Sequence, residues 1–183
     1  MRYAVFGGSF DPPHLAHAMA CLWALESGEV DRVLLVPVGR HAFGKKNVAS
    51  FEHRVQMCHL AVARLRDAVF VSDIESRREG ASYMVDTLRL LADEHPGAQF
   101  RLLAGTDVVE EFPKWKDLAE VLRRAPLLEL PRAAPNELFA DRPGALPLIS
   151  STAVRDALRT GRDAELLVAK SVREYIEAHK LYR

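Results

Sequence analysis

Apolar residues follow two alternating patterns along the chain. Short runs that are almost wholly apolar are typical of strands buried on both faces, and longer segments with apolar residues three or four positions apart are typical of helices. The pattern predicts strands at residues 2–6, 33–36, 69–71, 100–103, 127–130 and 146–149. It predicts helices at residues 14–28, 50–65, 82–95, 115–123, 151–159 and 171–179. This alternation predicts an α/β fold, a Rossmann-like doubly wound parallel sheet with helices on both faces.

The order of these elements indicates where a ligand would bind. The strands at residues 2–6 and 100–103 each run into glycine. In open parallel sheets ligands bind beyond the carboxyl ends of the strands, so we expect these two strands to point at one site. A length of 183 residues suits a single domain over 1–183, with a C-terminal helical part at about 150–183.

Composition narrows the class of protein. The 25 Lys and Arg balance the 25 Asp and Glu, and this zero net charge argues against a nucleic-acid partner but not against a small anionic ligand. Cys21 and Cys58 lie in apolar helical patterns without metal-binding spacing, which predicts reduced, buried thiols. No apolar run resembles a signal peptide or a membrane span. We therefore expect a cytoplasmic protein without a membrane partner, for which a homo-oligomer remains open.

The segment at residues 7–17, GGSFDPPHLAH, carries the first candidate site. Two glycines let the backbone approach a ligand, and the following helix presents its N-terminal amides and dipole to an anion. Two histidines three positions apart share a face of that terminus. The segment thus predicts a polyphosphate cradle formed by Gly7, Gly8, Ser9, Phe10, His14 and His17. The alternatives are a glycine-rich turn with incidental histidines and a zinc pair, which lacks a third nearby ligand.

A second candidate anion site lies near the end of the sequence, at residues 149–155, ISSTAVR. Serine and threonine are preferred helix N-caps, their hydroxyls and the exposed amides can meet an anion, and arginine can grip phosphate with two N–H groups. The candidate ligands are Ile149, Ser150, Ser151, Thr152 and Arg155. An ordinary capped helix with a surface arginine is the alternative.

With these two strings in place, the sequence resembles the HxGH nucleotidyltransferase superfamily, and most of all its bacterial nicotinate mononucleotide adenylyltransferases. Residues 80–88, 103–107 and 112–115 resemble that family's GxSYTxDT, GxD and aromatic segments, and the end of the chain resembles its usual ending. Three departures stand out. The family's glycine between the histidines is Ala16 here, whose methyl could crowd the nucleotide or be absorbed by a small backbone shift. The Pro-Pro-His-Lys string does not follow the strand at 33–36, and Pro131-Arg132-Ala133 stands directly after the strand at 127–130 where the family has Arg-Pro-Gly.

The resemblance implies further site residues. Gly105 would let the chain pass close to ATP, and Asp107 would accept hydrogen bonds from ribose hydroxyls. The implied mononucleotide ligands are Ser82, Tyr83, Thr87, Trp115, Lys116, His41, Lys45 and Arg132. In this set Trp115 offers a flat face to the pyridine ring, the helix start near Ser82 meets a carboxylate, and the basic residues hold the phosphate. Arg54 matches a family arginine that we expect to be structural.

The implied reaction joins ATP and nicotinate mononucleotide into deamido-NAD and pyrophosphate. The attacking phosphate monoester is already mostly dianionic at pH 7, so no general base is needed. His14, His17 and Arg155 would neutralise charge in the transition state, with Mg²⁺ bound to the ATP phosphates. Three alternatives stay open: an adenylyltransferase acting on nicotinamide mononucleotide or phosphopantetheine, a catalytically weak nucleotide-binding protein, and a nucleic-acid-binding module.

Overall fold

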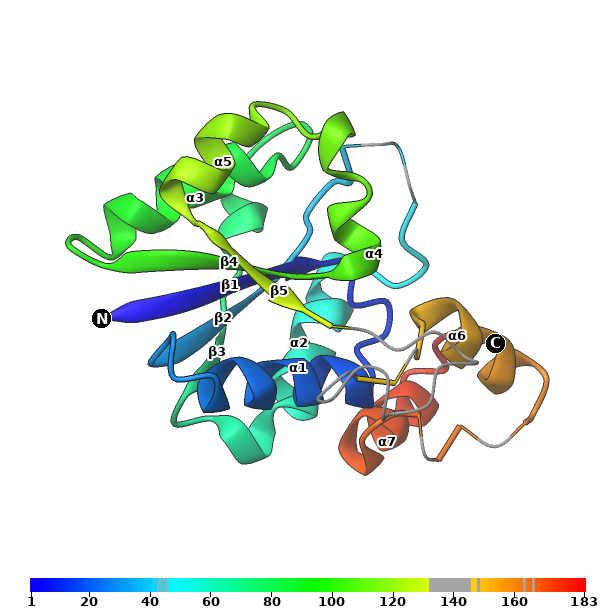
Figure 1. Cartoon of the computed structure of the whole chain (residues 1–183). Coiled ribbons are helices and arrows are strands. Elements are labelled where there is room, and N and C mark those ends of the chain that lie inside the picture. Colours follow the sequence, from blue (N-terminus) through cyan, green and yellow to red (C-terminus); the bar gives the residue numbers. More distant parts are fainter. Residues whose placement is uncertain (43, 45, 132–145, 148, 163, 166) are drawn as a thin grey trace.

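A five-stranded parallel sheet in the order β3-β2-β1-β4-β5 forms the centre of the molecule (Figure 1). The computed structural model describes residues 1–42, 44, 46–131, 146–147, 149–162, 164–165 and 167–183. The strands are β1 (Arg2–Gly8), β2 (Arg32–Pro37), β3 (Val69–Val71), β4 (Gln99–Gly105) and β5 (Leu127–Leu130). The strand order reverses between β1 and β4, so the two glycine-ended strands lie side by side. This confirms the predicted Rossmann-like α/β fold.

Helices cover both faces of this sheet. α1 (Leu15–Glu26) and α2 (Phe51–Ala61) lie on one face, and α3 (Met84–Glu94) and α5 (Leu118–Arg124) lie on the other (Figure 1). Alternate strand residues feed the two cores: Val33 and Leu35 pack with α1 and α2, whereas Leu34 packs with α3. Because both faces of the sheet are covered, the strand interiors are mostly apolar, as the apolar runs predicted, while charged residues such as Arg32 and Glu129 lie at strand ends or at the sheet edge.

The C-terminal helices form a third layer beyond the carboxyl ends of the strands. α6 (Ser151–Arg159) and α7 (Lys170–Ala178) lie next to the end of the sheet (Figure 1). Met57 of α2 shares a buried apolar cluster with Val154 of α6 and Val172 of α7. This packing brings the second predicted anion-binding segment to the end of β1.

Several element boundaries differ from the prediction. β1 and β4 continue through their glycines, since Gly8 still pairs with Pro37 and Gly105 with Leu130. The helix predicted at 115–123 begins only at Leu118, because a 3-10 turn at Phe112–Lys114 precedes it. The short helix α4 (Thr106–Val109) was not predicted. At residues 146–149 the described part forms no strand, and Leu146 only donates a backbone hydrogen bond to Pro131.

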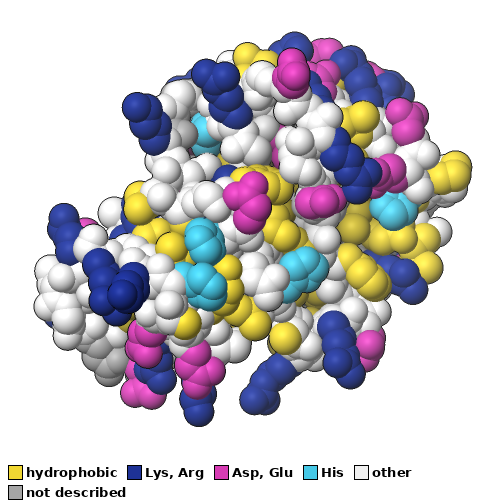
Figure 2. All heavy atoms as spheres, turned by 180° about the vertical axis from the view of Figure 1, so that it is seen from behind, with side chains coloured by type: hydrophobic (Ala, Val, Ile, Leu, Met, Phe, Trp, Pro, Cys, Tyr) yellow, Lys and Arg dark blue, Asp and Glu magenta, His cyan; other side chains and the backbone are white. Residues whose placement is uncertain are grey.

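The surface carries charges of both signs. On the face drawn in Figure 2, basic and acidic side chains of the described residues are interspersed and do not gather into a basic stripe. Within the described part of the chain, no helix has the length and apolar character needed to cross a membrane.

Candidate active site

A polar pocket of about 220 Å³ joins the two predicted anion-binding segments. Its lining includes Ser9, Phe10, His14, His17, Ile149, Ser150, Ser151, Thr152 and Arg155, all of them predicted, together with Asp11, Lys46 and Asn47. The segments are more than a hundred residues apart in sequence. They meet because α6 packs beyond the carboxyl end of β1.

Direct hydrogen bonds hold α6 against the loop that follows β1. The Ser151 hydroxyl donates to the Pro12 carbonyl at 2.9 Å, and the Arg155 guanidinium donates to the Asp11 carbonyl at 2.7 Å. A second Arg155 nitrogen lies 3.2 Å from the Thr152 hydroxyl oxygen. Ser150 caps α6 by accepting a hydrogen bond from the Ala153 amide at 3.1 Å. The predicted cap is therefore real, and the hydroxyl of Ser151 fixes the pocket wall.

The two histidines lie at the start of α1 and stack on one another. His14 is the N-cap and only 3% exposed, and the two ring centroids are 3.6 Å apart. The His14 amide donates to Nδ1 of His17 at 3.1 Å. Because an amide can only donate, Nδ1 of His17 is the accepting nitrogen, and a neutral His17 carries its proton on Nε2. This tautomer makes Nε2 of His17 a hydrogen-bond donor, and His17 lines the polar pocket.

Gly7 and Gly8 face a different pocket from the one predicted. They line the aromatic pocket described below, not the polar pocket. A Cβ on Gly7 would lie 2.7 Å from Cε of Met84, and one on Gly8 would lie 3.0 Å from the Phe10 ring. Phe10 is buried with a φ of 47°, a left-handed backbone that is costly for a side chain of this size. A Cβ on Gly8 would therefore crowd the buried Phe10 ring, whereas at Gly7 the contact is with the end of the flexible Met84 side chain.

Two buried charged residues, Asp11 and Arg54, hold the loop after β1 in place. The Asp11 carboxylate accepts hydrogen bonds from the Val48 and Ala49 amides at 2.7 and 3.1 Å, and from the Tyr182 hydroxyl at 2.7 Å. Burial and the neighbouring Asp11 raise the pKa of Tyr182 above its usual range. These contacts join three distant parts of the chain. Neither Asp11 nor Tyr182 was predicted to anchor the site, because no local pattern reveals such contacts.

Arg54 of α2 is the second anchor. Its side chain is almost fully buried, and its guanidinium donates to the carbonyls of Ser9 and Val38, both at 2.8 Å. Burial lowers the pKa of Arg54, with nearby Asp11 acting in the opposite direction. The arginine bridges the loops after β1 and β2, which agrees with the structural role expected for it.

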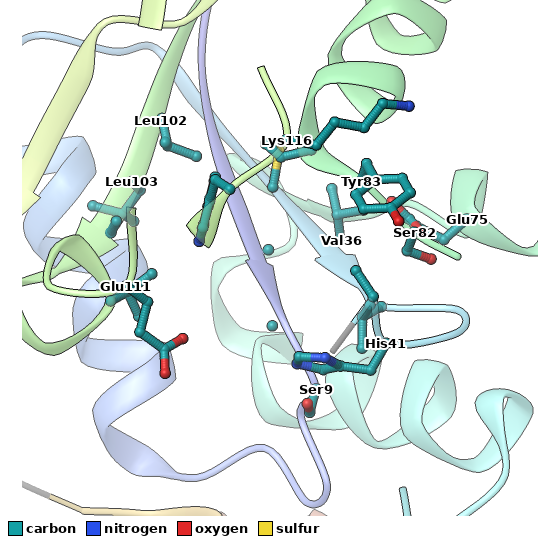
Figure 3. Close-up of a pocket in the computed structure, with 18 residues that line it drawn as sticks. Ser9, Val36, His41, Glu75, Ser82, Tyr83, Leu102, Leu103, Glu111 and Lys116 are labelled. Atoms are coloured by element: carbon teal, nitrogen blue, oxygen red, sulfur yellow. The ribbon is translucent and has the colours of Figure 1, made fainter. Parts of the chain in front are cut away.

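An aromatic pocket of about 260 Å³ adjoins the polar pocket, and Ser9 lines both. Its lining includes the predicted Ser82, Tyr83, Trp115, Lys116 and His41, with Met84, Glu75 and Glu111 in addition. Figure 3 shows Tyr83 and Ser82 on one side of the cavity, Leu102, Leu103 and Glu111 on the other, and Ser9 and His41 at one end. The loop after β2 is tied to the start of α3 by the Ser82 amide, which donates to the Arg40 carbonyl at 2.8 Å.

Several predicted ligands lie elsewhere. Thr87 is 1% exposed and donates its hydroxyl to the carboxylate of Glu75, which lines the aromatic pocket. Thr87 therefore holds a lining residue in place. Among the residues that the structure describes, Gly105 and Asp107 line neither pocket, because β4 continues through Gly105 into α4. Lys45 and Arg132 lie outside the described residues.

The polar pocket is also lined by Lys46 and Asn47, which were not among the predicted ligands. Lys46 directly follows Lys45, which was predicted to hold the mononucleotide phosphate, and Asn47 comes next. The signal for Lys46 was therefore present, but sequence alone could not choose between the two lysines.

The Ala16 methyl, for which crowding of the nucleotide was one of two predicted outcomes, is buried within the fold. Ala16 is 2% exposed and is not among the described residues that line the polar pocket. We expect Ala16→Gly to lower the free energy of unfolding by about 1 kcal/mol, the helix propensity cost of glycine, without raising kcat/KM. Thermal unfolding and initial rates test this, with Ala20→Gly, buried one turn later in α1, as the matched control. A faster Ala16→Gly enzyme would mean that the methyl does obstruct the site.

Comparison with known proteins identifies the family. Residues 5–157 match the sequence model of the cytidylyltransferase-like family. The chain is 41% identical to a relative from Anaeromyxobacter dehalogenans named as a nicotinate-nucleotide adenylyltransferase, with 98% of this chain and 96% of the relative covered. A relative of the same name from Myxococcus xanthus is 36% identical, with 100% and 95% covered.

Solved structures agree at the level of the fold. The nicotinic acid mononucleotide adenylyltransferase of Plasmodium falciparum, solved in complex with APC, superposes with a TM-score of 0.79 at 19% identity, covering 99% of this chain and 96% of the other. A nicotinate-nucleotide adenylyltransferase of Vibrio parahaemolyticus gives a TM-score of 0.76 at 23% identity, covering 100% and 95%. Together with the full-length sequence relatives, the two pockets and their motifs make this chain a member of the nicotinate-nucleotide adenylyltransferase family.

Proposed function

We propose that this protein transfers the adenylyl group of ATP to the 5′-phosphate of nicotinate mononucleotide, forming deamido-NAD and pyrophosphate. The observation that carries the proposal is the adjacency of the two pockets. One is polar and rich in phosphate donors, the other is aromatic, and they meet at Ser9. A reaction that joins a triphosphate to a pyridine nucleotide needs such a pair of sites side by side.

In this proposal the polar pocket holds the ATP phosphates. Its donors are the His17 ring, the Arg155 guanidinium, the Lys46 ammonium and the hydroxyls and amides at the start of α6. The amide dipoles at the starts of α1 and α6 favour negative charge at the same place. These groups supply positive charge and N–H donors where charge develops on the leaving pyrophosphate.

The aromatic pocket holds the mononucleotide. Trp115 offers a flat face for the pyridine ring, and stacking of this kind contributes about 1 kcal/mol beyond area burial. At the other wall, Met84 and Val85 open α3, and N–H groups in the first turn of a helix have no intrahelical acceptor. These amides can receive the ring carboxylate of nicotinate. An uncharged carboxamide would gain less from the helix dipole, which favours nicotinate over nicotinamide.

Catalysis then depends on positioning and charge neutralisation. The attacking phosphate is already mostly dianionic at neutral pH, so the site has no need of a general base. His17 and Arg155 act as hydrogen-bond donors that stabilise the charge on the α-phosphate and the departing pyrophosphate. His14 acts by fixing the ring of His17 through its amide and by stacking on it.

Magnesium would enter as part of the Mg–ATP substrate. Within the described residues the polar pocket offers one carboxylate, Asp11, whose two oxygens already accept hydrogen bonds from the protein. Such a site suits a Mg²⁺ held by phosphate oxygens and water. We expect EDTA to abolish pyrophosphate release, excess MgCl₂ to restore it, and EDTA alone to leave the melting temperature of the free protein unchanged. A lower melting temperature in EDTA would instead indicate a resident structural metal.

The reaction is tested by pyrophosphate release from ATP with nicotinate mononucleotide, nicotinamide mononucleotide or phosphopantetheine as acceptor. We expect the highest kcat/KM with nicotinate mononucleotide and deamido-NAD as the product by mass spectrometry. A preference for nicotinamide mononucleotide would overturn the assignment of the ring carboxylate to α3. ATP binding without turnover on any acceptor would overturn the enzymatic proposal.

A further inference from the structure

The aromatic pocket has two opposing walls that come from different elements. The start of α3 contributes Ser82, Tyr83 and Met84, and the segment after α4 contributes Trp115 and Lys116. Trp115 lies in a short connection between a 3-10 turn and α5, and part of its support comes from the Phe112 ring, whose centroid is 4.9 Å away. The distance between the walls therefore depends on contacts that cross from one to the other.

Lys116 makes two such contacts, both with α3 or its N-cap. Its ammonium lies 3.3 Å from Oδ2 of Asp86 and 4.6 Å from the centroid of the Tyr83 ring. Figure 3 shows the side chain extending over Tyr83 and away from the cavity. Lys116 was predicted to hold the mononucleotide directly, but its charge is directed instead at the opposite wall.

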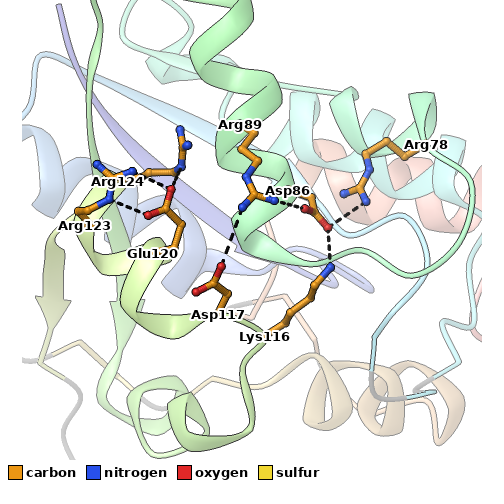
Figure 4. Close-up of polar contacts among 8 residues, drawn as sticks. All are labelled: Arg78, Asp86, Arg89, Lys116, Asp117, Glu120, Arg123 and Arg124. Atoms are coloured by element: carbon orange, nitrogen blue, oxygen red, sulfur yellow. Dashed lines mark hydrogen bonds and ion pairs between the residues drawn. The ribbon is translucent and has the colours of Figure 1, made fainter.

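Asp86 is the acceptor at the centre of this crossing (Figure 4). Its carboxylate pairs with Arg78 at 3.2 Å and Arg89 at 2.9 Å as well as with Lys116. The Asp86 side chain is 19% exposed, whereas that of Lys116 is 52% exposed. Burial alone would raise the pKa of Asp86, but the hydrogen bond and ion pair with Lys116, together with Arg78, outweigh it and lower that pKa.

The network also reaches Asp117, the residue after Lys116. Arg89 lies 3.9 Å from the carboxylate of Asp117, whose φ of 53° places it in the left-handed region just before α5. Arg89 thus touches Asp86 on its own helix and Asp117 across the gap. Isolated exposed ion pairs contribute little, but a carboxylate shared by three cations acts as a network, in which single pairs are coupled.

We propose that Asp86 is a positioning residue that sets the width of the aromatic pocket, by holding Lys116 over Tyr83, and so determines affinity for the pyridine ring of the mononucleotide. This inference rests on the proposed function, because it assigns that ring to the space between Trp115 and the start of α3. Asp86 is not among the described residues that line either pocket, so it acts through Lys116. None of the described residues that line the polar pocket belongs to this network, so ATP affinity should be unaffected.

The test compares Asp86→Asn, Lys116→Met and the double variant. We expect each single variant to raise KM for nicotinate mononucleotide about fivefold, as for coupled contacts in one network, with kcat and KM for ATP near wild type. The double variant should be no worse than the worse single variant. Lys116→Arg, which keeps a cation in place, should recover most of the affinity.

The matched control is Glu120→Gln. Glu120 also accepts from two cations, Arg123 and Arg124, but all three lie within α5 and make no crossing to α3 (Figure 4). It should leave both KM values unchanged. If Asp86→Asn failed to fold, the exposed Lys116→Met variant alone would still decide the matter.

The outcomes distinguish the proposed function from the positioning role of Asp86. A wild-type enzyme inactive on nicotinate mononucleotide would overturn the proposed function itself. An active wild-type enzyme whose Asp86→Asn and Lys116→Met variants keep an unchanged KM for the mononucleotide would overturn only the positioning role. Equal rises in both KM values, or independent and additive effects of the two substitutions, would also overturn it.

Discussion

The His17→Ala variant is expected to lose about two to three orders of magnitude in kcat, as when an oxyanion-hole donor is removed, with a much smaller change in KM for either substrate. The Nε2 proton of His17 is directed by the hydrogen bond that its Nδ1 accepts from the His14 amide. Charge on the α-phosphate and pyrophosphate grows towards the transition state, so loss of the donor penalises turnover more than binding. Initial-rate kinetics over both substrates measures the split.

Two further variants interpret that result. His17→Gln keeps a donor close to the Nε2 position and should retain more activity than His17→Ala. His59→Ala removes an exposed imidazole from the last turn of α2 and should be indistinguishable from wild type. A His17→Ala enzyme with normal kcat would exclude the ring from the mechanism.

Arg54→Met is expected to lower the free energy of unfolding by about 3 kcal/mol, because the part-buried Ser9 and Val38 carbonyls would both lose their charged donor. For a chain of this size that corresponds to a fall of roughly 10 °C in melting temperature. Activity should fall as well, since Ser9 lies where the two pockets meet. Calorimetry together with pyrophosphate release at a temperature well below unfolding would separate the two effects.

The controls for this prediction use charge and position. Arg54→Lys keeps the charge, but a single ammonium cannot reproduce the two directed contacts of the guanidinium, so it should recover only part of the stability. Arg64→Met changes an exposed arginine in the 3-10 turn after α2 and should have little effect. An unchanged melting temperature for Arg54→Met would contradict the anchoring role.

Sequence periodicity was sufficient to predict the fold because the apolar pattern of each strand and helix indicates which of its faces is buried. Residues such as Leu34 and Leu35 face opposite cores, which the unbroken apolar run at 33–36 already indicated. The boundaries that differed depend on interactions across the sheet. β1 continues through Gly8 because Gly8 still pairs with Pro37 of β2. This pairing cannot be predicted from the glycine and its sequence neighbours.

Local sequence patterns predicted only part of the candidate site. The positions of His14, His17 and Arg155 at the polar pocket could be predicted because cap positions and phosphate donors have local signatures. Thr87 was misassigned because a threonine near a helix start is compatible with either a ligand or a buried partner such as Glu75. The structural roles of Asp11 and Tyr182 depend on contacts between distant residues, which a single sequence does not display.

The hydrogen bond between Tyr182 and Asp11 affects the order in which parts of the structure can form during translation. A growing chain makes β1, the following loop and the histidines of α1 early, but the Asp11 carboxylate in that loop meets its partner Tyr182 only when residue 182 has been added. The wall formed by α6 is likewise made late, after every strand of the sheet. During translation the sheet can therefore form well before the polar pocket is complete. A nascent chain halted before residue 182 would contain the loop after β1 but would lack the hydrogen bond from Tyr182 to Asp11.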